Sequence, residues 1–283
     1  MLAGREIIPT QNSAIAIRLD RVTKHFPTAS GKLHTAVQDM TLDIQDGVFV
    51  SVVGPSGCGK STVLNLTAGL VAPSDGSVEI YSKPLLGLNR HASYMFQQDA
   101  LLPWKTVAEN VTLGLTFEGK HRAQMQETGR DWIRRVGLDG FADCFPHQLS
   151  GGMRKRVSMA QSWIVNPDML LMDEPFSALD IHTRLKMEQE LLQLWSGSRK
   201  TVLFVTHDLE EAIALSDEVA VLSAGPASRL VKRYKVDLAR PRDLIDIRTQ
   251  PEFTDLYRHI WADLREEVLK SYEECGSQDA TSV

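Results

Sequence analysis

The sequence predicts an α/β protein with a mostly parallel sheet, and two features of the chain carry this prediction. Apolar runs of strand length recur at 48–53, 169–172, 201–205 and 218–222. Helix-prone segments separate several of these runs, which is typical of parallel strands joined by helices. A glycine-rich loop also follows the first run and leads directly into a helical pattern.

Composition and charge exclude several classes of protein. Hydrophobic residues make up 43% of the 283 positions and charged residues 24%, which excludes a disordered or fibrous chain. The net charge of −5 gives no global attraction to nucleic acid. The three cysteines are too few and too scattered for a disulfide framework or a CxxC metal site, which favours a reduced, cytosolic compartment.

Strands and turns alternate in the first half of the chain. We expect strands at 14–22, 40–44 and 48–53, and a short strand at 78–80 behind a Ser-Asp-Gly-Ser turn. The segment STVLNLTAGL after the glycine-rich loop predicts a partly buried helix.

The second half begins with a change of composition. From about 102 to 146 the sequence is polar and helix-prone, which predicts a helical insertion into the α/β core, and 180–195 predicts a long helix. A later apolar stripe predicts an amphipathic helix over 251–270 that packs on the core. No apolar run approaches the length that spans a bilayer and the first residues do not form a secretory signal, so any membrane role is expected to be peripheral.

A phosphate-binding loop is the strongest chemical signal. Residues 54–61, GPSGCGKS, fit the pattern G-x-x-x-x-G-K-[ST] between a predicted strand and a predicted helix. Such a loop directs backbone N–H groups at phosphate oxygens, while Lys60 supplies charge for the β- and γ-phosphates and the Ser61 hydroxyl can bind Mg²⁺. The sequence therefore predicts nucleotide binding through Gly54, Pro55, Ser56, Gly57, Cys58, Gly59, Lys60, Ser61 and Thr62.

Two carboxylates end the apolar run at 169–172. Asp173 is a candidate for the Mg²⁺ shell, and Glu174 is a candidate to polarise an attacking water. A solvated acidic turn is the alternative, and the phosphate-binding loop upstream makes it the weaker one.

A second glycine-rich helix start lies at Ser150, Gly151 and Gly152 in the sequence LSGGM. Its backbone N–H groups form another anion-binding N-terminus, although an ordinary helix cap explains the motif equally well when it is taken alone. One nucleotide needs one such cradle, so the second suggests an ATP bound by another subunit.

Six motifs in order, GPSGCGKST, FQQDALLPW, LSGGM, LLMDEP, SALD and VTHD, resemble the ATP-binding subunit of an ABC transporter. The resemblance implies a P-loop NTPase of the RecA-like type, with an antiparallel β-subdomain and a helical subdomain. It implies an ATPase that uses ATP and Mg²⁺. We expect this ATP-binding domain over 14–240, its helical subdomain at about 98–165, a helical extension at 241–270 and a disordered tail at 271–283.

The resemblance also assigns roles to residues that the pattern alone leaves open. Gln97 matches the glutamine that senses Mg²⁺ and the water, Asp180 matches a loop that reaches across a dimer, and His207 matches the histidine that contacts the γ-phosphate. Without their neighbours, Gln97 would be a surface amide and Asp180 a helix cap. Phe26 is a candidate platform for adenine, with a core position as the alternative.

Two positions depart from the family pattern. Met153 replaces a common glutamine in the signature, so we expect a side-chain hydrogen bond to be lost there while the cradle stays intact. Cys58 lies inside the phosphate-binding loop, where we expect its backbone to matter more than its thiol, although alkylation there would obstruct ATP.

The segments FQQDALLPWKTVAENV, FSALDIHTR and LARPRDLIDIRTQPEF are most similar to the nitrate, sulfonate and taurine branch of bacterial importers. This resemblance implies uptake of a small solute through separate permease subunits at the cytoplasmic face of the inner membrane. It also implies a second ATP-binding subunit, in a homodimer, and a periplasmic or lipoprotein substrate-binding protein, with no nucleic-acid partner. The rival functions are an ABC-type ATPase of DNA repair, chromosome organisation or translation, a P-loop kinase, and a regulatory or lipid-exporting cassette.

Overall fold

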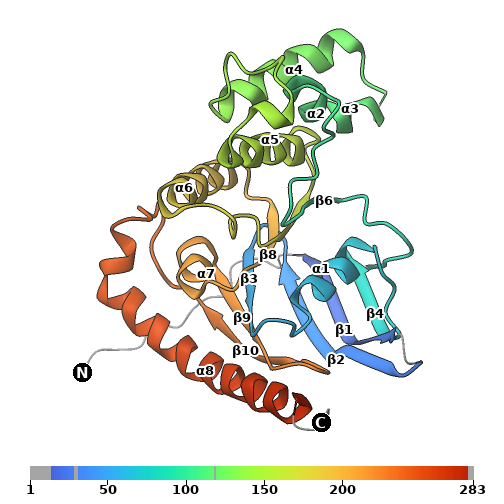
Figure 1. The fold of residues 1–283 in the computed structure, drawn as a ribbon, viewed down its shortest axis with the longest axis vertical. Coiled ribbons are helices and arrows are strands. Elements are labelled where there is room, and N and C mark those ends of the chain that lie inside the picture. Colours follow the sequence, from blue (N-terminus) through green and yellow to red (C-terminus); the bar gives the residue numbers. More distant parts are fainter. Residues whose placement is uncertain (1–13, 29–30, 118, 280–283) are drawn as a thin grey trace.

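The computed structural model describes residues 14–28, 31–117 and 119–279, and these form two sheets with helices around them (Figure 1). The larger sheet has the order β10-β9-β3-β8-β7-β6 and is parallel except for β10, which runs antiparallel to β9. The smaller sheet, β2-β1-β4-β5, is antiparallel. The predicted α/β core and the antiparallel subdomain that the resemblance implied are therefore both present.

The strands are β1 (Ile15–Pro27), β2 (Leu33–Gln45), β3 (Phe49–Val53), β4 (Asp75–Ile80), β5 (Lys83–Pro84), β6 (Ala92–Met95), β7 (Met169–Asp173), β8 (Thr201–Val205), β9 (Glu218–Leu222) and β10 (Leu230–Lys235). The first two strands are longer than their apolar patterns indicate, because they pair with each other along most of their length. The sequence did not single out β6, whose four residues carry no periodic pattern of their own.

The helices are α1 (Lys60–Ala68), α2 (Val107–Val111), α3 (Leu113–Phe117), α4 (Arg122–Arg135), α5 (Gly151–Ile164), α6 (Ile181–Ser198), α7 (Leu209–Leu215) and α8 (Pro251–Asp279), with 3₁₀ turns at Pro146–Gln148 and Ile247–Thr249. Helices α2 to α5 form a group at one end of the molecule, between β6 and β7 in the chain (Figure 1). Among the described residues, no helix has the length and apolar character needed to cross a membrane.

Three clusters of buried side chains hold these layers together. One packs the main sheet against α6, α7 and α8, and a second lies between the two sheets and α1. The third belongs to the helical group, with Val107, Leu115, Ile133, Val157 and Ala160 among its members. The helical group thus has a core of its own, and α5 joins it to the main sheet, because its Met159 and Trp163 pack in the first cluster.

The C-terminal helix corrects one expectation. The disordered tail was expected from residue 271, but α8 continues to Asp279. The helix-forming pair Glu273 and Glu274 follows Lys270 without a proline, so nothing in the sequence stops the helix at 270. Only the last four positions of the expected tail, 280–283, lie outside the described residues.

Candidate functional site

The phosphate-binding loop connects β3 to α1. Gly59 has φ +89, and a Cβ there would lie 2.9 Å from Val37 Cγ1, so only glycine fits this turn. Lys60 Nζ donates to the carbonyls of Gly54 and Pro55, both at 2.9 Å, and is almost fully buried. These bonds hold the ammonium over the loop, where phosphates would lie.

Two oxygen ligands suitable for a metal ion meet beside this loop. Ser61 Oγ donates to Asp173 Oδ1 at 3.0 Å, and the Tyr94 hydroxyl donates to Asp173 Oδ2 at 3.3 Å. Mg²⁺ prefers hard oxygen ligands and is commonly held by one or two protein groups, together with water and phosphate. The pair Ser61 and Asp173 therefore fits Mg²⁺, and Tyr94 supports the carboxylate from the side of β6. No sequence pattern had singled out Tyr94.

Two predicted catalytic side chains, Gln97 and His207, converge on one carboxylate oxygen of a third, Glu174. Glu174 Oε2 lies 3.0 Å from His207 Nδ1 and accepts a hydrogen bond of 3.4 Å from Gln97 Nε2. Glu174 has φ +42, a conformation that is unfavourable for a residue with a Cβ, and its N–H donates to the Val205 carbonyl at 2.9 Å. The ends of β6, β7 and β8 thus bring together residues that lie far apart in the sequence.

The signature motif lines a separate cavity. A cavity of about 580 Å³ contains Ser150, Gly151 and Gly152, together with residues from 137–141 and 178–186, and none of its lining residues belongs to the phosphate-binding loop. Ser150 Oγ accepts the N–H of Met153 at 3.3 Å and so caps α5. The start of α5 at the signature motif and the start of α1 at the phosphate-binding loop therefore face different spaces.

Asp180 caps α6, because its Oδ1 accepts the N–H of Thr183 at 3.0 Å. This backbone hydrogen bond lowers the pKa of the Asp180 carboxyl. The residue is exposed at the edge of the signature cavity, so the cap leaves it accessible to another subunit. Its two interpretations, helix cap and contact across a dimer, are compatible.

Phe26 lies near the end of β1 and is partly exposed. The Lys24 ammonium lies 5.2 Å from the centre of its ring, so a cation already faces this aromatic side chain. The ring does not belong to the buried core, and its role as an adenine platform stays a prediction.

The sequence also missed a link between the loop of Gln97 and the signature helix. The buried Lys155 Nζ donates to the Gln97 carbonyl at 2.6 Å and pairs with Asp99 Oδ1 at 3.1 Å. Arg154 Nε donates to Asp99 Oδ2 at 3.1 Å and its Nη1 donates to the Leu149 carbonyl at 2.8 Å. An acidic residue two positions after Gln97, with two basic residues just past the signature, is the only signal that could have found this link.

The chain also matches known proteins over most of its length. The family model described as ABC transporter matches residues 37–177. The chain is 41% identical to a taurine import ATP-binding protein of Rhizobium johnstonii, over 92% of this chain and 99% of the relative. This chain belongs to the ABC transporter family. It is also 37% identical to a bicarbonate transport ATP-binding protein of Synechocystis, over 90% of this chain and 93% of that protein.

Two solved structures of a related cassette bear on the hydrolysis of ATP. The chain matches the dimeric structure of a bacterial ABC transporter cassette with a TM-score of 0.70 and 32% identity, over 79% of this chain and 100% of that one. A second structure of that cassette is a post-hydrolysis state that holds ADP and Pi. This ABC cassette is accordingly an ATP-binding protein and an ATPase, and the resemblance to the importer branch is confirmed by the names of its relatives.

Proposed function

We propose that this chain is the ATP-hydrolysing subunit of a bacterial ABC importer that takes up a small anion, such as nitrate, a sulfonate, taurine or a related solute. The observation that carries the proposal is the convergence of Gln97 and His207 on Glu174, beside the pair Ser61 and Asp173. Relatives named for taurine import and bicarbonate transport match over nearly the whole chain and support the class of solute.

Two copies of the chain act together in this proposal. The signature cavity shares no lining residue with the phosphate-binding loop, so one chain does not close both around one nucleotide. A head-to-tail pair places Ser150, Gly151 and Gly152 of one copy on the γ-phosphate held by Lys60 of the other. The dimeric form of the related cassette supports this arrangement.

Hydrolysis follows from the groups around Glu174. Its carboxylate accepts a proton from the attacking water. Gln97, in the loop after β6, orients the same carboxylate through its hydrogen bond. His207 faces Glu174 with Nδ1, which leaves Nε2 for the γ-phosphate. Mg²⁺ bound at Ser61 and Asp173 would neutralise charge on the phosphates.

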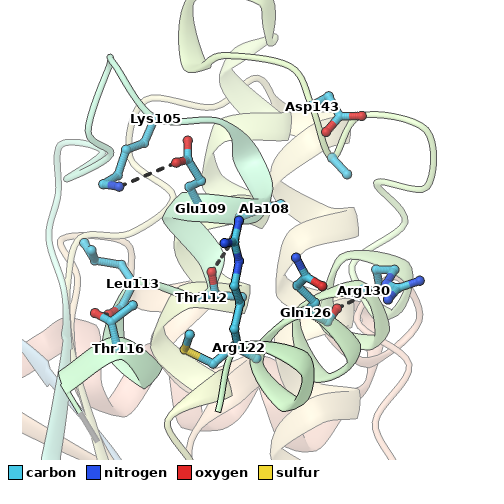
Figure 2. A pocket seen from close by; sticks show the side chains of 13 residues that line it. Lys105, Ala108, Glu109, Thr112, Leu113, Thr116, Arg122, Gln126, Arg130 and Asp143 are labelled. Carbon is cyan, nitrogen blue, oxygen red and sulfur yellow. Dashed lines mark hydrogen bonds and ion pairs between the residues drawn. The ribbon is translucent and has the colours of Figure 1, made fainter. Parts of the chain in front are cut away.

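ATP binding drives the permease through the helical group. A groove of about 570 Å³ lies between α2, α3 and α4 and is lined by charged, polar and apolar side chains, among them Lys105, Glu109, Leu113, Arg122 and Arg130 (Figure 2). Trp104 lies three residues before the start of α2 and is 70% exposed, an unusual position for a large aromatic side chain. We propose that a short cytoplasmic helix of a separate permease subunit binds in this groove and against Trp104. This contact holds the chain at the membrane.

The closing of the two subunits transmits work to that groove. Gln97 contacts Glu174, and its carbonyl is held by Lys155 on the helix that begins at the signature. A change at Gln97 is therefore passed to the first turns of α5 and through this helix to the helical group. ATP binding closes the dimer and hydrolysis resets it, which alternates the access of the permease.

Affinity isolation of the tagged chain from gently solubilised host membranes tests the proposal. Recovery of permease subunits and a substrate-binding protein supports an importer, and the ligand of that binding protein identifies the solute. Recovery of nucleic-acid or ribosomal partners without a permease contradicts it. Trp104→Ala should reduce recovery of the permease, while Trp261→Ala, at a partly exposed tryptophan of α8, should leave recovery unchanged.

A further inference from the structure

Arg184, in the first turn of α6, joins two segments of the site that are distant in sequence. Its Nη2 donates to the carbonyl of Leu179 at 3.2 Å, and its Nη1 donates to Asp208 Oδ2 at 3.4 Å. Leu179 directly precedes Asp180, and Asp208 directly follows His207. One guanidinium therefore connects the segment that is expected to contact the partner subunit with the segment that carries His207.

Three hydrogen bonds besides the one from Arg184 hold Asp208 in place. Its Oδ1 accepts the backbone N–H groups of Glu210 at 2.9 Å and of Glu211 at 3.1 Å, so it caps α7. Its own N–H donates to Thr206 Oγ1 at 3.0 Å. Because His207 lies between Thr206 and Asp208, a displacement of Asp208 carries the histidine backbone with it.

Buried carboxyls surround the same guanidinium. Glu188 on α6 and Glu211 on α7 are both nearly inaccessible to solvent, and burial raises the pKa of each while the charge of Arg184 lowers it. Arg248 serves Glu188 from the C-terminal segment, with Nη2 at 3.0 Å from Glu188 Oε2. Arg248 is thus, like Arg184, an arginine beside a buried carboxyl. In the described part of the chain it makes no contact with Leu179 or Asp208.

The hydrogen bonding of Arg184 is incomplete. Its Nε is buried and has no hydrogen-bond partner among the residues that the structure describes. A buried donor without a partner is unfavourable, so a rearrangement that supplies one would be stabilised. This free donor permits a second arrangement of the segment 177–180 against α6.

We propose that Arg184 is a positioning residue, which transmits the docking of the partner subunit at residues 177–180 through Asp208 to His207. The proposal rests on the proposed function, because it requires two copies to close around ATP. The planar guanidinium bonds two acceptors at fixed geometry, which a lysine ammonium does not reproduce. A shift of the Leu179 carbonyl therefore moves Asp208, and the contact between His207 and Glu174 tightens or loosens with it.

The variant Arg184→Lys tests this role. It keeps the positive charge among the buried carboxyls and removes the planar guanidinium that bonds Leu179 and Asp208 at the same time. In the transporter isolated from host membranes, we expect kcat for ATP hydrolysis to fall about tenfold, which is the effect of roughly one lost hydrogen bond in the transition state. The Kd for ATP and the midpoint of thermal unfolding should stay near those of the wild type, since lysine keeps the charge among the buried carboxyls and Arg184 bonds to Leu179 and Asp208 rather than to the phosphate-binding loop.

Two further variants separate positioning from stability. Arg248→Lys makes the same exchange in the same cluster and should keep the wild-type kcat. Asp208→Asn keeps the cap of α7 and removes the charge that Arg184 contacts, so it should lower kcat, and the double variant Arg184→Lys with Asp208→Asn should be no slower than the slower single variant.

Three results would overturn the proposal: a wild-type kcat for Arg184→Lys, an equal loss in Arg248→Lys, or fully additive losses in the double variant. These outcomes differ from a failure of the proposed function, which would appear as unchanged hydrolysis when Glu174 is replaced by glutamine in the same preparation.

Discussion

His207 Nδ1 lies 3.0 Å from Glu174 Oε2, although 33 residues separate them in the chain. Glu174 reaches this place in a left-handed backbone conformation, which costs about 1–2 kcal/mol for a residue with a Cβ. The neighbouring strand β8 holds it through the Val205 carbonyl, and Ser177 Oγ donates to the Glu174 carbonyl at 3.0 Å. These two contacts hold Glu174 in the strained conformation, with its carboxylate facing His207.

Replacing Glu174 by glutamine should abolish turnover and keep ATP binding. The amide preserves the shape of the side chain but cannot accept a proton from water, so we expect hydrolysis to fall at least about 100-fold. Without hydrolysis the closed dimer should accumulate with ATP. Phosphate release and size-exclusion chromatography measure both effects, with Glu127→Gln on the exposed face of α4 as the control. Wild-type turnover in Glu174→Gln would remove this residue from the mechanism.

The ammonium of Lys60 should dominate ATP affinity. It is nearly buried among the loop carbonyls, and within the described part of the chain no second cation is bonded to the carbonyls of Gly54 and Pro55. Lys60→Met keeps the length of the side chain and removes the charge, so we expect affinity to fall at least about tenfold. Titration with a fluorescent ATP analogue measures this, and Lys83→Met, at an exposed position in β5, should bind as the wild type does. Equal affinity in both variants would contradict the role of Lys60.

Local sequence was sufficient for the parts of the site in which backbone and side chain come from one segment. The phosphate-binding loop and the capped start of α5 are of this kind, because spacing alone defines a glycine-rich turn before a helix. The supporting contacts of Tyr94, Lys155 and Arg184 are of another kind. Each joins segments that only the tertiary fold brings together. Tyr94 and Arg184 carry no periodic or spacing signal, and for Lys155 the only signal is its place just past the signature, with Asp99 two positions after Gln97.

At the end of α8 the sequence predicted less structure than the fold contains. A polar composition was interpreted as disorder from residue 271, yet the helix continues to Asp279. Composition sets the apolar area that a segment can bury, but a helix that is already nucleated upstream adds further residues at little cost.

The thiol of Cys58 should be slow to react, although its place in the phosphate-binding loop suggested sensitivity to alkylation. The side chain is fully buried, and burial raises the pKa of the thiol despite the opposing charge of Lys60. We expect iodoacetamide at neutral pH to label the partly exposed Cys144 at least about tenfold faster than Cys58, as measured by mass spectrometry of peptides. Equal rates in the native chain would show that the loop opens frequently, and unfolding in denaturant should equalise the rates.

Glu211 should make the stability of the fold depend on pH. Burial raises the pKa of this carboxyl from 4.5 to about 8; the hydrogen bond from Thr206 and the charge of Arg184 oppose the shift, and the charges of Glu188 and Asp208 add to it. Between these two values the folded state retains a proton that the unfolded state has released. The contribution of Glu211 is therefore fully present below pH 4.5 and is lost as the pH rises through 8.

Glu211→Gln tests this dependence because the amide has nearly the same shape and does not titrate in this range. From pH 5.5 to 8.5 the free energy of unfolding of the wild type should fall, relative to the variant, by on the order of a few kcal/mol. Urea denaturation at each pH gives both curves, and Glu127→Gln should follow the wild type because its side chain is exposed. Parallel curves for Glu211→Gln and the wild type would mean that the buried carboxyl is ionised throughout, with Arg184 as its counter-charge.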